Sequence, residues 1–104
     1  MNEFEQLRYM NKVMSAIAHE WRYRLLLTIE EKKRIHQKDL LNIFNNFKDI
    51  HPVEQSTISH HLSILKNVRV IKTERKGKNV FYTFNQPLMK EIQKFAKDHV
   101  KKWR

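Results

Sequence analysis

The chain has 104 residues, the usual length of one compact domain, and 40% of them are hydrophobic, which excludes an intrinsically disordered protein. Its 21 Lys and Arg residues outnumber 11 Asp and Glu residues and give a formal charge of +10, which is typical of proteins that bind nucleic acids, although a basic protein without such a role can share it. The chain has no cysteine, which excludes disulfides, thiolate metal sites and cysteine nucleophiles and fits a reducing compartment.

The first segment is predicted to be an amphipathic helix, because its apolar residues recur every three or four positions. The members of this stripe are Phe4, Leu7, Met10, Met14 and Ile17. Residues 1–10 also carry Glu3, Glu5 and Arg8 and contain no unbroken apolar run. We therefore expect neither a signal peptide nor a membrane span there, and a cytoplasmic protein.

Two further helices are predicted before residue 48. Trp21, Leu25 and Ile29 form the apolar stripe of the second helix, and the wholly charged residues 30–34 are interpreted as its solvated end followed by a turn. The third helix is short, and its inward face consists of Leu40, Leu41, Phe44 and Phe47. Residues 48–53 break the pattern, because Pro52 disfavours helical geometry in the residue before it.

Residues 56–67 are predicted to form a helix with two different faces. Ile58, Leu62 and Leu65 lie within about 60° of one another at 100° per residue and form its buried side. His61 lies near this arc, and we expect it to be partly buried. The opposite side has no acidic residue and carries Ser56, Ser59, His60, Ser63 and Asn67. Such small polar groups on an exposed helix can approach base edges in the major groove of DNA.

After that helix the hydrophobic period changes to two residues, which predicts strands at 70–75 and 80–84. The strands flank residues 76–79, where Gly77, the only glycine, suits a turn that requires a positive φ. The tip of this hairpin is basic, with Arg75, Lys76 and Lys78. From Pro87 another amphipathic helix is predicted, with an apolar stripe of Leu88, Ile92, Phe95 and Trp103.

The predicted order is four helices, a β-hairpin and a last helix, in a mainly α fold with a small β-hairpin (α+β). A helix with an apolar inner face and a polar outer face, followed directly by a basic hairpin, is typical of a winged helix-turn-helix domain. We therefore predict one domain over residues 1–104, with the helix-turn-helix at 36–67 and the wing at 70–85. The apolar stripes of residues 1–18 and 87–104 need more partner surface than one small domain supplies, which predicts a homodimer through these two helices.

Three blocks of the sequence resemble the ArsR/SmtB family of bacterial repressors, in the order in which that family has them. Residues 16–27 (AIAHEWRYRLLL) are similar to its second helix, residues 55–65 (QSTISHHLSIL) to its recognition helix, and residues 70–82 (VIKTERKGKNVFY) to its wing. The resemblance implies a homodimeric transcriptional repressor, built on its first and last helices. It also implies that the two recognition helices read successive major grooves of double-stranded DNA.

Candidate site residues come from this resemblance and from the helical faces together. The resemblance places Gln55, Ser56, Ser59 and His60 in the groove, and the last three also lie on the polar outer face. We assign contacts with the DNA backbone to hydroxyls and cations of the recognition helix and wing, namely Thr57, Ser63, Lys66, Arg75, Lys76 and Lys78. We assign the dimer interface to the apolar stripes of the terminal helices, namely Phe4, Leu7, Met14, Leu88, Ile92 and Phe95.

The chain departs from the family pattern at three places. Glu20 and Trp21 stand where a proline and a small polar residue are usual. Residues 45–54 form a longer turn than the family has, which favours a different angle for the recognition helix. Glu54 replaces a hydroxyl N-cap, and because its carboxylate repels phosphate, no phosphate contact is assigned at that helix start.

No cofactor and no metal switch are predicted. Asp98 and His99 are neighbours on a helix and diverge by about 100°, so they do not readily chelate one ion, and the same holds for His60 and His61. A site shared across the dimer through Glu91 or His99 stays open. A small-molecule or protein inducer also stays open, because several aromatic side chains could line a pocket. A place in the core or at the dimer seam is favoured for these side chains. These aromatic residues are Trp21, Tyr23, Phe44, Phe95 and Trp103.

Other classes of function have less support. The sequence has no phosphate-binding glycine-rich loop, and Ser56, Ser59 and Ser63 have no oriented acid, so no enzyme is predicted. Two alternatives to a specific repressor stay open, a non-specific nucleic-acid-binding protein and a winged-helix module for protein interaction. The first predicts more lysine on the recognition face, and the second predicts no need for cations at the wing tip.

Overall fold

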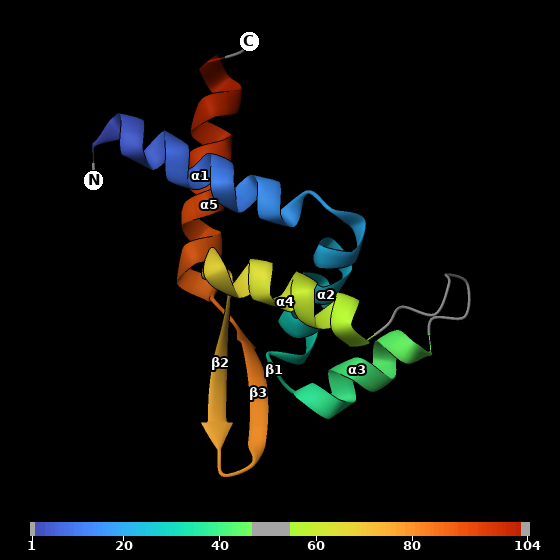
Figure 1. Cartoon of the computed structure of the whole chain (residues 1–104). Coiled ribbons are helices and arrows are strands. Elements are labelled where there is room, and N and C mark those ends of the chain that lie inside the picture. Colours follow the sequence, from blue (N-terminus) through green and yellow to red (C-terminus); the bar gives the residue numbers. More distant parts are fainter. Residues whose placement is uncertain (1, 47–54, 103–104) are drawn as a thin grey trace.

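The computed structural model describes residues 2–46 and 55–102, and the side chains of this part as far as residue 98 (Figure 1). The predicted succession of four helices, a hairpin and a last helix is confirmed, with one short strand added. The elements are α1 (Glu3–Ile17), α2 (Glu20–Lys32), β1 (Arg34–His36), α3 (Gln37–Asn45), α4 (Gln55–Asn67), β2 (Ile71–Lys76), β3 (Asn79–Phe84) and α5 (Gln86–Lys102). The hairpin of β2 and β3 projects from the end of the molecule opposite to both termini.

Side chains that accept a hydrogen bond from the first turn mark the start of four helices in the described part of the chain, including α5, where Asn85 Oδ1 accepts from the N–H of Leu88 at 3.4 Å. Such caps stabilise a helix start because the first N–H groups have no partner within the helix. Asn2 caps α1, and histidine takes this role for both α2 and α3. His19 Nδ1 accepts from the N–H of Trp21 at 3.2 Å, and His36 Nδ1 accepts from the N–H of Lys38 at 3.0 Å. Each of these ring nitrogens must therefore lack a proton.

A small antiparallel sheet with the strand order β1-β3-β2 joins the wing to the helix-turn-helix. Its outer strand β1 corrects the prediction that residue 34 belongs to a solvated turn, because Arg34 pairs with Thr83 and Ile35 with Tyr82. Ile35 is buried, so burial in the core and pairing with β3 outweigh the charged character of the preceding residues. His36 Nε2 also lies 3.0 Å from Asn79 Oδ1, which ties the start of α3 to the wing.

The wing hairpin closes with the tight turn that its single glycine predicts. Lys76 pairs with Asn79, so that two residues, Gly77 and Lys78, form the loop. Gly77 has a φ of +62°, and a positive φ at the first loop position is the arrangement of a type II′ turn. Because this turn matches the right-handed twist of the strands, the hairpin needs no longer loop.

Within the described ranges 2–46 and 55–102, one hydrophobic core holds the five helices and the sheet together. Every helix contributes an apolar stripe, which explains why the periodic pattern predicted these elements well. The most deeply buried side chains are Met10, Val13, Leu25, Ile29, Leu40, Phe44, Ile58, Leu65, Val70 and Ile71. Trp21 packs on this core, as favoured for these aromatic residues, whereas Tyr23 is 51% exposed.

The six residues assigned to the dimer interface fall into two groups. Phe4, Leu7 and Met14 of α1 are exposed, as a partner surface requires. Leu88 and Ile92 of α5 are instead buried in the core of their own chain, at 7% and 8% exposure, and Phe95 packs against that core. Leu88 and Ile92 thus expose little area in the single chain, and their assignment to the dimer interface stays a prediction.

Within the described residues, no helix combines the length and the apolar character that crossing a membrane requires.

Candidate nucleic-acid interface

Helix α4 presents the two faces that its sequence predicts. Ile58, Leu62 and Leu65 are buried, and His61 lies with them at 8% exposure, which confirms the expected partly buried histidine. The residues on the other side are all exposed, including the predicted groove residues Gln55, Ser56, Ser59 and His60 and the predicted backbone contacts Thr57, Ser63 and Lys66. The apolar stripe therefore fixes the rotation of α4 so that its uncharged polar groups and Lys66 point outward.

A shallow cavity of about 230 Å³ lies between α4 and the wing, and we call it the wing groove. Its lining residues are Gln37, Ser59, Leu62, Ser63, Lys66, Thr73, Arg75, Val80 and Tyr82. The groove thus brings together four predicted site residues from distant parts of the sequence, namely Ser59, Ser63, Lys66 and Arg75. Two of its described lining residues are cations and none is acidic, so its surface favours an anionic ligand.

Gln37 and Thr73 line the same groove, and the sequence reasoning missed both. Thr73 lies two residues before Arg75 on β2, and alternate residues of a strand share a face. The period-two pattern was therefore a signal that pointed to Thr73. Gln37 is the first residue of α3, and no local signal in the sequence places it beside a strand some 40 residues later.

The wing carries the expected cations, but it also contains a carboxylate that pairs with one of them. Arg75, Lys76 and Lys78 are all exposed. Glu74 Oε1 lies 3.7 Å from Lys76 Nζ, and Glu74 Oε2 lies 3.2 Å from Arg34 Nε. Exposed ion pairs of this kind are weak, so Lys76 stays able to exchange Glu74 for another anion. The Arg34 guanidinium also stacks 3.8 Å from the centre of the Phe81 ring, which holds β1 against β3.

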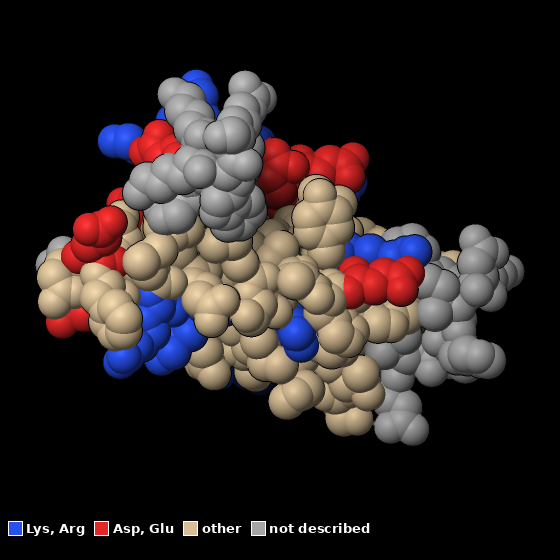
Figure 2. All heavy atoms as spheres, turned by 90° about the horizontal axis from the view of Figure 1, so that it is seen from above, with Lys and Arg blue, Asp and Glu red and all other residues tan. Residues whose placement is uncertain are grey.

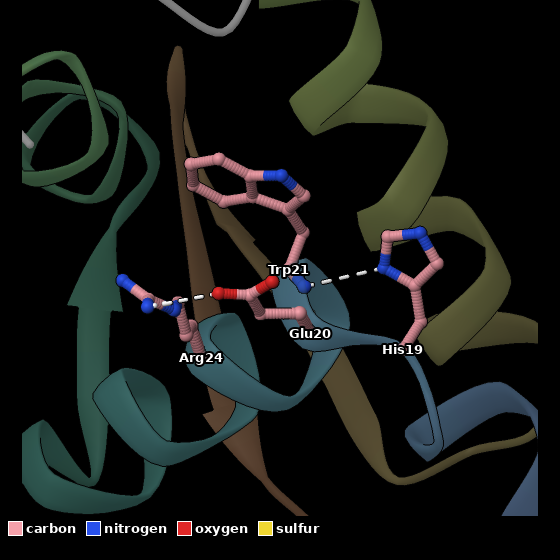
Figure 3. Close-up of polar contacts among 4 residues, drawn as sticks. All are labelled: His19, Glu20, Trp21 and Arg24. Atoms are coloured by element: carbon pink, nitrogen blue, oxygen red, sulfur yellow. Dashed lines mark hydrogen bonds and ion pairs between the residues drawn. The ribbon is translucent and has the colours of Figure 1, made fainter. Parts of the chain in front are cut away.

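The inner face of α4 rests on the first turn of α2, residues 19–22, which we call the α2 turn. The His19 and His61 rings are 4.6 Å apart, and Figure 3 shows His19 directed toward α4. Arg22 binds the carbonyl oxygen of Ala16 and lies with a guanidinium nitrogen 3.3 Å from His61 Nδ1. Because guanidinium groups only donate, His61 Nδ1 must accept here and must lack a proton. Burial first, and then His19, Arg22 and His60, lower the pKa of His61.

The α2 turn also contacts the other helix of the helix-turn-helix. The Trp21 indole extends away from His19 (Figure 3), and the centre of its ring lies 5.9 Å from that of Phe44 in α3. Glu20 points to neither helix and forms an ion pair with Arg24 at 3.0 Å. The two residues that depart from the family pattern thus have described roles, Trp21 in packing and Glu20 in an ion pair along α2.

Several predictions concern residues that lie outside the described part of the chain. These are the inward position of Phe47, the long turn with Pro52, the charge of Glu54, and the place of Trp103. The side chain of His99 is likewise not described, so the shared metal site stays untested. Within the described residues, no three His, Asp or Glu side chains gather in a group that suits a metal ion.

An exposed polar helix that packs against α2 beside a basic wing defines a winged helix-turn-helix domain. The relatives of the chain give the family. The chain is 32% identical to the transcriptional repressor SdpR of Bacillus subtilis over 82 residues, which are 79% of this chain and 82% of that protein. It is 27% identical over 96 residues to a homologue of the transcriptional repressor SmtB from Synechocystis, covering 92% of this chain and 67% of that protein. The chain belongs to the ArsR/SmtB family of DNA-binding transcriptional regulators, and it is not an enzyme.

Solved structures agree with this fold. An ArsR-like regulator from Rhodococcus matches with a TM-score of 0.75 and 16% identity, over 95% of this chain and 86% of that one. The repressor PagR of Bacillus anthracis matches with a TM-score of 0.71 and 23% identity, over 90% of this chain and 99% of that one. No family model matches the chain.

Proposed function

We propose that the protein is a homodimeric transcriptional repressor that recognises an inverted-repeat DNA sequence with α4. The observation that carries this proposal is the exposed outer face of α4, which has no acidic residue and borders a groove with Lys66 and Arg75. A helix of this kind fits the major groove, where each base pair presents a distinct pattern of donors and acceptors. Occupation of a promoter by the dimer would block transcription.

Two groups of residues have different roles in this proposal. Gln55, Ser56, Ser59 and His60 contact base edges and supply sequence preference. The DNA backbone is held by Thr57, Ser63, Lys66, Arg75, Lys76 and Lys78, which contribute to binding of any duplex. Thr73 and Gln37 border the same surface and extend it along the wing groove.

The proposed dimer uses the exposed apolar residues of α1. Phe4, the most exposed of them at 67%, continues the stripe of Leu7 and Met14. Figure 2 shows the end of the molecule opposite to the wing, where uncharged atoms cover most of the middle and charged groups lie toward the margins. A dimer through this end leaves both wings free. Its two recognition helices would then enter major grooves about 34 Å apart, one turn of DNA.

We propose that this repressor has no metal switch. The name of one relative, a homologue of the cadmium resistance regulatory protein CadC from Staphylococcus aureus, refers to a metal, and that relative is 26% identical over 81 residues. The present chain has no cysteine to provide a thiolate site. Addition of Cd²⁺ or Zn²⁺ at micromolar concentration should therefore leave DNA binding unchanged, and release of DNA by either ion would contradict this part of the proposal.

Selection of bound sequences from a random duplex pool tests the function most broadly. We expect enrichment of an inverted repeat whose half-sites lie one DNA turn apart. Enrichment of no motif would identify a general nucleic-acid binder instead, and absence of binding would favour a protein-interaction module.

Salt dependence tests the phosphate contacts separately. If the dimer makes six to ten phosphate contacts, affinity for the selected duplex should fall on the order of 10³–10⁵-fold between 50 and 200 mM salt. A binding constant that stays the same across this range would contradict a basic surface that holds the DNA backbone.

A further inference from the structure

We propose that the α2 turn positions the recognition helix for DNA, and that protonation of His61, which lies against His19 and Arg22, weakens sequence-specific binding. This inference rests on the proposed function, because it concerns how the same helix is held. The cluster lies on the protein side of α4, whereas the residues assigned to base contacts lie on the outer side. Its residues therefore act through α4 and do not touch DNA.

The geometry requires neutral imidazoles on both sides of this contact. His19 Nδ1 accepts the N–H of Trp21, and His61 Nδ1 accepts from the guanidinium of Arg22. A proton on either nitrogen removes that hydrogen bond. A proton on His61 also places a second positive charge 3.3 Å from Arg22 and beside the ring of His19.

Among the described residues, the other charged groups near this cluster do not offset such a proton. The groups that act electrostatically on His61 are His19 and Arg22 from α2 and His60 from α4 itself, and all three lower its pKa. The acid in the α2 turn, Glu20, is paired with Arg24. From α1 the described polar contact is the carbonyl oxygen of Ala16, which binds Arg22 and holds that cation in place.

The direction of the pH effect follows from proton binding. His61 has a lower pKa in the folded chain than its ordinary value of 6.5, so the unfolded chain binds more protons. The contact between α2 and α4 is therefore at full strength above pH 6.5 and is lost as the pH falls through the lower, folded value. His61 directly follows His60, which is assigned to base contacts in the major groove. A shift of α4 at His61 therefore moves the face that contacts the bases.

Specific and general binding should respond in opposite ways to acid. Base contacts require α4 at a fixed angle, whereas flexible lysine and arginine side chains hold phosphates with less demand on geometry. Protonation of histidines also adds positive charge, which strengthens attraction to any duplex. The ratio of affinities for a selected and a scrambled duplex is therefore the quantity that reports the position of α4.

We would measure both affinities by fluorescence anisotropy from pH 7.5 to pH 5.0 at constant ionic strength. For the wild-type protein we expect the ratio to fall on the order of fivefold or more, the lower end of typical coupling between two sites. His61→Gln keeps an acceptor for Arg22 but does not titrate, and it should keep the ratio nearly constant. A ratio that is independent of pH in the wild-type protein would overturn the inference.

Two variants separate positioning from other effects. His60→Gln removes the neighbouring imidazole from the outer face, so it should bind more weakly at every pH and still lose specificity in acid. His19→Ser keeps an N-cap for α2 but removes the ring that faces His61. It should retain helical content and lose part of the specificity at pH 7.5. Equal pH dependence in His61→Gln and the wild-type protein would show that the cluster does not control α4.

Amide hydrogen exchange of the free protein tests the same inference without DNA. Protection of the α4 amides should decrease between pH 7.5 and pH 5.0, after correction for intrinsic exchange, in the wild-type protein but not in His61→Gln. This result would support a pH-sensitive contact between α2 and α4 even if the selection from the random pool enriched no duplex. In that case the proposed function alone would fail. Constant protection in the wild-type protein would contradict the inference even if specific binding were found. If His61→Gln does not fold, His61→Asn, which also keeps an uncharged acceptor and does not titrate, provides the same comparison.

Discussion

At the scale of single residues, the outer face of α4 and the wing have separable roles. The polar groups of Ser59 and His60 are exposed on α4, and Lys78 is exposed in the tip of the hairpin. Their chemistry differs in the same way as their positions, because hydroxyls and imidazoles match individual base edges whereas an ammonium is attracted to every phosphate. Mutations in the two places should therefore change different properties.

Ser59→Ala and His60→Ala are expected to reduce the preference for the selected duplex over a scrambled one by about 1–3 kcal/mol per lost base contact. Lys78→Ala should weaken both duplexes about equally and flatten the salt dependence, because it removes one phosphate contact. Competition binding measures both quantities. The division of roles would be wrong if all three variants lowered the two affinities by the same factor.

The sequence predicted the exposed residues of this surface well, because helical periodicity shows which side chains point away from the core. It did not predict the partners across the wing groove. Gln37 reaches the groove through a contact between elements, which leaves no periodic signal, whereas Thr73 follows from the alternation that it shares with Arg75 on β2. The pairing of Lys76 with Glu74 was also missed, although the two residues lie on the same face of one strand.

At the scale of elements, the hairpin turn has the most specific requirement in the sequence. Gly77 has a φ of +62°, which side chains other than glycine and asparagine adopt only with strain, and nothing lies within 4 Å of an added Cβ. The strain is thus the whole cost. Gly77→Ala should destabilise the fold by about 1 kcal/mol, and Gly77→Asn should cost less. Urea unfolding measures both variants, and equal stability of Gly77→Ala and the wild-type protein would contradict the turn.

Two features of the elements could not be predicted from the sequence, namely the short strand β1 and the surface on which the apolar stripe of α5 packs. The five helices that the structure describes are long enough to show a stripe, and the hairpin has a glycine between two alternating runs. The three residues of β1 show neither signal, because their pairing with β3 depends on how the chain folds back. The stripe of α5 was recognised, but periodicity does not distinguish a face that packs on its own chain from one that packs on a partner.

At the scale of the whole molecule, residues in the core of one chain and residues at the proposed dimer interface should respond differently to mutation. Leu88→Ala should destabilise each subunit by about 2–5 kcal/mol, because Leu88 is buried within the chain. Leu7→Glu should leave the fold intact and shift the dimer toward monomers, because Leu7 is exposed on α1. Thermal unfolding and light scattering report the two effects. A monomeric wild-type protein at micromolar concentration would remove the dimer from this account.

Sequence-specific repression by this protein depends on entry of the outer face of α4 into the major groove of DNA. Because the chain has no cysteine, a single Ser59→Cys variant can carry a photo-crosslinking group at a known position, and Ser15→Cys on the exposed side of α1 is its matched control. We predict crosslinks from position 59 to bases inside each half-site of the selected duplex and none from position 15. Crosslinks from position 15 to bases, with none from position 59, would contradict the account.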